Sequence, residues 1–185
     1  MKAKRLILWI VLAVLLVALL PPAFRAFSRA RRRLAADRLY EKAIGHYMLE
    51  RVDESLATFK EIASRYADLP LGALAQLKIA FLTYDQWHNL DKAESLFREF
   101  LDKHPDGVMY LSEVSLPDYD GELELVAYYF LGRIASDRGR PDEARAWFDK
   151  ILARGSANPA NMIVGETTVL VRQMDEAARK QGGSG

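Results

Sequence analysis

The side chains that could do chemistry are scattered along this chain of 185 residues. Residues 118–121, Asp-Tyr-Asp-Gly, are similar to the middle of a calcium-binding loop, but Leu116 and Ala127 then stand where the first and twelfth ligands are needed. We find no phosphate-binding glycine loop and no nucleophile motif. The three histidines lie far apart, without a partner at metal-ligand spacing: His46, His88 and His104. The sequence therefore predicts a protein that is not an enzyme, with no cofactor, no metal and no small-molecule substrate.

The charge of the chain is divided unevenly along its length. Eight of the 26 Lys and Arg residues lie in residues 1–33, which hold no acidic residue. The rest of the chain has 18 basic and 25 acidic residues, a net charge of −7. Nucleic-acid affinity depends on basic contacts to phosphates, so we expect no nucleic-acid partner. The absence of cysteine excludes disulfides and thiolate chemistry.

The chain begins with a hydrophobic segment. Leu6 to Leu20 is an unbroken apolar run of fifteen residues, and extending it through Phe24 gives nineteen. A bilayer core needs roughly 20 residues, and aromatic residues are favoured at the interfaces, where Trp9 and Phe24 would lie. Residues 1–24 are therefore predicted to be a single transmembrane anchor, and the membrane to be a partner. A cleaved signal peptide is the alternative.

A basic segment follows, at residues 25–36. On a helix its arginines fall on one side, where they would suit anionic lipid head groups. The alternative is a solvated stripe on an ordinary linker helix. The proposed head-group contacts are Arg25, Arg29, Arg32 and Arg33.

Three stretches later in the chain share one pattern, with an acidic helix start, a small residue and an aromatic residue four positions later. The small residues are Ser55, Ala93 and Ala144, and the aromatics are Phe59, Phe97 and Phe148. Each stretch follows another helical pattern, and self-similarity at a period in the thirties indicates a repeat protein. The expected helices are 37–50 with 53–66, 71–87 with 90–103, and 121–137 with 141–153, their ends marked by Pro and Gly.

The predicted fold is therefore all-α: a transmembrane helix, about three helical repeats over 37–159, and a capping helix with a flexible tail in 160–185. We expect the last helix at 165–180, with one apolar face over the third repeat made of Leu170, Val171, Met174, Ala177 and Ala178. Residues 108–120 interrupt the repeats without a helical period. This insertion is either a binding element or a plain surface loop.

The repeats resemble the tetratricopeptide repeat (TPR), a 34-residue helix–turn–helix. The third repeat matches best, through Tyr128, Leu131-Gly132, Gly139, Ala144 and Phe148. In that family the first helix of each pair lines a binding groove. The resemblance implies a peptide-binding groove, although these side chains could instead be core. The corresponding positions are Tyr40, Ile44, Tyr47, Met48, Leu77, Phe81, Tyr84, Asp85, Tyr129 and Arg133, with Asp137 at the end.

A narrower resemblance is to the YfgM-type proteins, which have one amino-terminal span followed by an acidic TPR array. It rests on residues 66–80, which lead into the second repeat. It implies a single-pass protein of the bacterial inner membrane, with the repeats in the periplasm and a translocon or chaperone as partner. Five basic residues after the span, against three before it, favour the cytoplasm instead.

Two functions are expected from these features. The first is a membrane-anchored adaptor that binds a protein partner, such as a membrane-protein complex, through the repeats. The second is a structural accessory subunit of a larger membrane complex, held by its transmembrane and basic helices.

Overall fold

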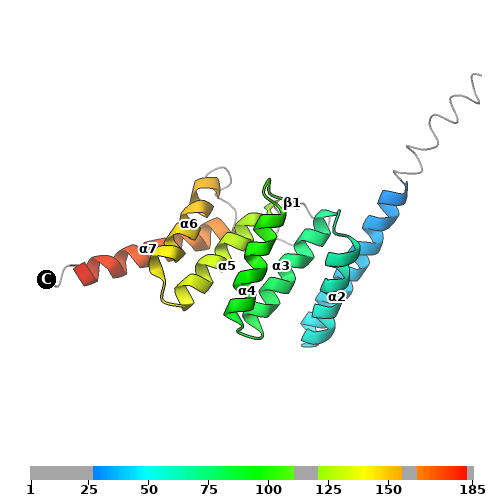
Figure 1. The fold of residues 1–185 in the computed structure, drawn as a ribbon, viewed down its shortest axis with the longest axis horizontal. Coiled ribbons are helices and arrows are strands. Elements are labelled where there is room, and N and C mark those ends of the chain that lie inside the picture. The colour runs from blue at the N-terminus through cyan, green and yellow to red at the C-terminus, as the bar shows by residue number, and fades with distance from the viewer. Residues whose placement is uncertain (1–26, 111–120, 156–161, 183–185) are drawn as a thin grey trace, which may run out of the picture.

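A computed structural model describes residues 27–110, 121–155 and 162–182. Helices follow one another along the long axis of the molecule in sequence order (Figure 1). A first helix occupies residues 27–48, and it is followed by α2 (Val52–Arg65), α3 (Pro70–Asp85), α4 (Leu90–Lys103), α5 (Leu123–Asp137), α6 (Pro141–Gly155) and α7 (Met162–Gly182). The described part is thus helical, as predicted, except for one pair of two-residue strands, β1 (Met109–Tyr110) and β2 (Gly121–Glu122).

Helix ends lie where the sequence places its turn residues. Pro70 occupies the first turn of α3, and the Asn89 side chain caps α4 by accepting a 3.0 Å hydrogen bond from the Lys92 N–H. Gly139 ends α5 with a φ of +66°. The Gly139 and Arg140 N–H groups donate to the carbonyls of Ser136 and Ala135, the two bonds of a Schellman motif.

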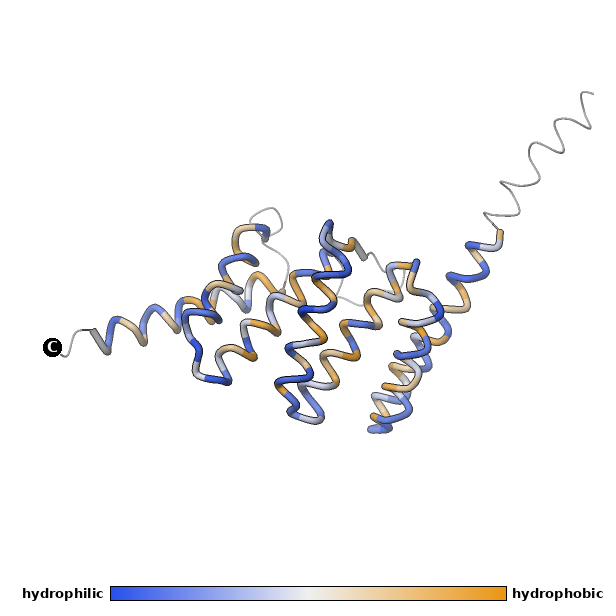
Figure 2. The backbone as a smooth tube through the Cα atoms, in the orientation of Figure 1, coloured by the Kyte–Doolittle hydropathy of each residue, from blue (hydrophilic) through white to orange (hydrophobic). Residues whose placement is uncertain are grey.

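The repeated small and aromatic residues form the core of each helix pair. All six are at most 1% exposed, so they are packing residues: Ser55, Phe59, Ala93, Phe97, Ala144 and Phe148. The Ser55 hydroxyl donates to the Ala43 carbonyl at 2.9 Å, so even the polar member is satisfied. Hydrophobic and hydrophilic residues are interspersed along the helices, as expected when each helix buries one side (Figure 2).

The first helix differs from the prediction. We expected a basic segment at 25–36 to be separate from a helix at 37–50, whereas one helix runs from 27 to 48 within the described residues. Nothing between Leu34 and Asp37 breaks a helix, since Ala35 and Ala36 are good helix formers. Arg32 fixes this helix to the α2–α3 turn through two hydrogen bonds to Asp68, of 2.8 and 2.7 Å.

The last helix covers the third pair with only part of its length. Val171 is buried and Leu170 and Met174 are half-buried, as expected of a cap. Ala177 and Ala178, which were predicted to share that face, are exposed. The reason is visible in Figure 1, where the end of α7 extends beyond the other helices.

The insertion is closed at its base by the two short strands. Met109 pairs with Glu122 and Tyr110 with Gly121, so α5 begins at Leu123 and not at 121. Residues 111–120 are outside the described part, and so is the predicted anchor at 1–24. No helix among the described residues has the length and hydrophobicity of a membrane span.

Candidate protein-binding face

Four helices contribute side chains to one face of the molecule, which we call the first-helix face because three of them are the first helices of their pairs. It comprises residues of the helix at 27–48, of α3, of α5 and of α7. Its centre is an aromatic cluster around Phe130 of α5. The Phe130 ring lies 5.4 Å from Phe81, 5.5 Å from Tyr84 and 5.3 Å from Tyr129, measured between ring centroids. All four side chains are partly exposed.

Hydrogen bonds connect these aromatics across the helices. The Tyr84 hydroxyl of α3 donates to Asp137 of α5 at 2.7 Å. The Tyr129 hydroxyl donates to Glu166 of α7, also at 2.7 Å, and accepts a 3.2 Å bond from Arg133. The polar ends of the rings are thus held in place, and both side chains stay partly exposed.

The same environment keeps both phenols neutral. Burial, and then the hydrogen bond to Asp137, raise the pKa of Tyr84 to about 12. Burial, and then the bond to Glu166, also raise the pKa of Tyr129. Both hydroxyls therefore stay protonated throughout the physiological range and keep donating to Asp137 and Glu166.

The first repeat extends this face less tightly. Tyr47 and Ile44 are half-buried, and Met48 is 74% exposed. Burial raises the pKa of Tyr47, and the negative charge of Asp85 raises it further. Tyr47 of the first helix is thus within electrostatic reach of Asp85 of α3. The structure therefore brings together most of the predicted groove positions.

Two predicted groove residues are core residues instead. Tyr40 is 5% exposed and packs edge-on against Phe59, with centroids 5.6 Å apart. Leu77 is 1% exposed. Neither side chain is exposed enough to contact a ligand. Lys78, the neighbour of Leu77, is partly exposed, and its ammonium lies 5.8 Å from the centroid of the Phe81 ring.

Three participants of the face were missed from the sequence: Lys78, Phe130 and Glu166. Phe130 is one residue beyond a carried-over position, and the run Tyr128-Tyr129-Phe130 gives no sign of which ring faces outward. Glu166 lies in α7, which was predicted only as a cap. Among the described residues, no group of three or more His, Asp or Glu side chains is placed to hold a metal ion.

The arginines proposed for lipid head groups have different surroundings. Arg25 lies outside the described residues, and Arg29 and Arg33 are exposed on the first helix. Arg32 is engaged with Asp68, and this hydrogen bond lowers the pKa of the Asp68 carboxyl. Contact of these arginines with lipid stays a prediction.

Comparison with known proteins supports the repeat interpretation. The tetratricopeptide repeat family matches residues 120–159, which include α5 and α6. The family match and the helical structure of the described residues fit a TPR protein, and TPR modules typically bind proteins without catalysis. No curated protein matches the chain. The repeats thus suggest an adaptor in protein–protein interaction.

Proposed function

We propose that this protein is a membrane-anchored adaptor that binds a partner protein through the first-helix face. The observation that carries the proposal is the set of partly exposed aromatics held together there, centred on Phe81, Tyr84 and Tyr129. Tyrosine and arginine are enriched among the residues that dominate binding energy, and Arg133 lies beside Tyr129. Rings fixed by hydrogen bonds lose little entropy when a partner binds.

Anchoring is supported by the sequence of residues 1–24. An anchored adaptor meets partners at the same membrane at a raised effective concentration, so a modest affinity suffices. The proposal places the protein in a bacterial inner membrane with one span and with the repeats in the periplasm. A chaperone-like or translocon-associated role fits that location. Protection of the repeats from added protease in intact and permeabilised cells tests on which side they lie.

The second candidate is an accessory subunit held in a larger membrane complex by its amino-terminal elements. Its support is the exposed beginning of the first helix, which projects beyond α2 (Figure 1). Phe27 and Leu34 are 62% and 60% exposed there, beside the exposed Arg29 and Arg33. Apolar side chains between arginines suit a contact at a membrane surface.

One pull-down experiment separates the two candidates. The full-length chain is purified in detergent with its partners, which are quantified by mass spectrometry. Tyr47→Ala with Phe81→Ala and Tyr129→Ala should reduce recovery of the partner at least tenfold if the first-helix face binds it. Met48→Asp with Arg133→Ala alters the same face with little loss of packing, and it should also reduce recovery. Asp102→Ala, at an exposed position of α4 that belongs to neither surface, is the matched control.

The second candidate predicts the opposite result. Arg29→Glu with Arg33→Glu should then abolish recovery, and both first-helix-face variants should retain it. Thermal unfolding of each variant establishes that it is folded. Unchanged recovery with the two face variants would reject the adaptor proposal.

A further inference from the structure

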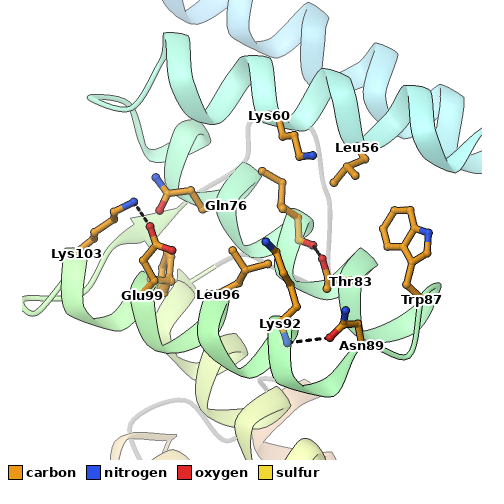
Figure 3. A pocket seen from close by; sticks show the side chains of 12 residues that line it. Leu56, Lys60, Gln76, Thr83, Trp87, Asn89, Lys92, Leu96, Glu99 and Lys103 are labelled. Carbon is orange, nitrogen blue, oxygen red and sulfur yellow. Dashed lines mark hydrogen bonds and ion pairs between the residues drawn. The ribbon is translucent and has the colours of Figure 1, made fainter.

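A groove lies between α2 and α4, with α3 as its floor (Figure 3). Its volume is about 430 Å³, which is within the usual size of ligand sites. We call it the α2–α4 groove. Its two sides are the second helices of two pairs, and its α3 residues, Gln76, Ile79 and Thr83, are not those that α3 contributes to the first-helix face.

The floor of the groove is apolar. Leu56 of α2, Ile79 of α3 and Leu96 of α4 line it, and each is partly exposed. Trp87, 43% exposed, lies at one end. A large indole and three aliphatic side chains that remain in contact with water gain free energy when another apolar surface covers them.

The rim of the groove is basic. Lys60 of α2 and Lys92 of α4 extend into it from opposite sides (Figure 3). Neither ammonium is paired with a carboxylate among the described residues. The single acidic lining residue, Glu99, is already paired with Lys103 at 2.5 Å. Two uncompensated cations thus flank an apolar floor, in a chain whose residues 34–185 carry a net charge of −7.

In the third repeat, the space that corresponds to this groove is filled by large side chains of α5 and α6. Alignment of the second helices through Ala93 and Ala144 places Trp147 at the position of Leu96. Alignment of the first helices through Ala80 and Gly132 places Tyr128 at the position of Gln76. The Tyr128 and Trp147 rings stack with centroids 5.7 Å apart. Two cations cover the indole, with Lys150 Nζ at 3.9 Å and the Arg98 guanidinium at 5.4 Å from its centroid. The α2–α4 groove lacks these rings and is open.

The length of the groove indicates the shape of its occupant. The lining residues of α4 begin at Lys92 and end at Lys103, eleven residue steps apart. At a rise of 1.5 Å per residue this is about 16 Å, which corresponds to three turns of an added helix. A helix laid between two others over a third is an ordinary way for an amphipathic peptide to dock.

We propose that the α2–α4 groove binds an acidic amphipathic helix of a partner protein. Its apolar side chains lie on Leu56, Ile79 and Leu96, and its Asp or Glu side chains pair with Lys60 and Lys92. Charge complementarity selects this occupant, because the amino-terminal apolar segment of the chain itself is basic and is repelled by the same lysines. The site is separate from the first-helix face, so one adaptor holds two partner segments.

The test is a selection of random twelve-residue peptides displayed on phage, with the full-length chain in detergent as the target. Binding of each enriched peptide is then measured on three variants. Lys60→Glu with Lys92→Glu reverses the rim charge. Gln76→Tyr with Leu96→Trp copies the residues that fill the next pair. Lys42→Glu, an exposed lysine of the first helix, is the matched charge-reversal control.

The proposal predicts enrichment of peptides in which Asp or Glu alternates with bulky apolar residues at helical spacing. These peptides should bind the rim-reversal and groove-filling variants at least tenfold more weakly, and they should bind the control and the Met48→Asp/Arg133→Ala variant as they bind the natural chain. Their binding should also weaken as salt is raised. The proposal is overturned if no enriched peptide depends on Lys60 and Lys92, or if self-association of the chain requires the same lysines.

Discussion

The close approach of α5 and α6 predicts that alanine at position 132 destabilises the protein. Gly132 is buried in α5, against the ring of Phe148 in α6. A Cβ atom at position 132 would lie 2.7 Å from Cδ1 and 2.8 Å from Cζ of that ring, and closer still to Cε1. Phe148 is 1% exposed, so its ring cannot turn out into solvent without disturbing the core. The two helices would have to separate.

The magnitude follows from two opposing effects. Alanine is better than glycine in a helix by about 1 kcal/mol. Overpacking a core costs about 1–3 kcal/mol, and three ring atoms within contact distance place this site at the upper end. Gly132→Ala should therefore lower the free energy of unfolding by roughly 2 kcal/mol. Gly45 of the first helix is a matched control, because a Cβ there would meet no atom within 4 Å, so Gly45→Ala should stabilise by up to about 1 kcal/mol.

Urea unfolding followed by far-ultraviolet circular dichroism measures both variants. With slopes of about 1–3 kcal/mol per molar urea, the midpoint of Gly132→Ala should fall by roughly 1 M. Phe148→Leu should relieve the contact, so the double variant should be more stable than the sum of the single effects predicts. Equal midpoints for Gly132→Ala and Gly45→Ala would refute the packing argument.

Three further predictions concern charged and polar contacts. The pKa of Tyr84 is raised to about 12, so the stability that its neutral hydroxyl contributes is complete below pH 10 and is lost as the pH rises through 12. Asp137→Asn should lower the pKa of Tyr84, which an ultraviolet titration measures with Tyr84→Phe as the reference. Glu94, 15% exposed in its side chain, is paired with Arg98, Arg138 and Arg140, and Glu94→Gln should cost roughly 1 kcal/mol at neutral pH. Burial raises the pKa of Glu94, but the bonds from Arg98 and Arg140 outweigh it and lower the pKa. The difference from the natural chain should therefore shrink as the pH falls below 4.5, and a constant difference would contradict this. Arg32→Ala should raise the pKa of Asp68, which an NMR titration of that carboxyl detects.

The sequence predicted most helix ends because particular residues mark them. The ends of α3 to α6 are marked by the helix-start and helix-stop residues Pro70, Asn89, Gly139 and Pro141. The helices from 52 to 153 were predicted to within about two residues at each end. The first helix was divided wrongly because only a change in charge, and no helix breaker, separates Leu34 from Asp37. Ala177 and Ala178 were misplaced because a periodic pattern does not show where the neighbouring helices end.

The surface was predicted less well than the core. Tyr40 and Leu77 share a repeat position with Tyr129, yet only Tyr129 stays partly exposed, since burial depends on neighbours that one repeat does not encode. The α2–α4 groove exists because Gln76 and Leu96 are smaller than their counterparts Tyr128 and Trp147. The repeat alignment contains that difference, but the resulting space is evident only when the helices are packed.

Site-specific photo-crosslinking in cells tests the central proposal, binding at the first-helix face, most directly. A photoreactive amino acid is placed at Met48, whose side chain is 74% exposed on that face, or at the exposed Asp102 of α4 as a control. We predict a crosslinked protein adduct from position 48 that is absent from position 102 and is lost when Arg133→Ala is added. An adduct that forms equally from both positions, or that is unaffected by Arg133→Ala, would contradict the proposed binding face.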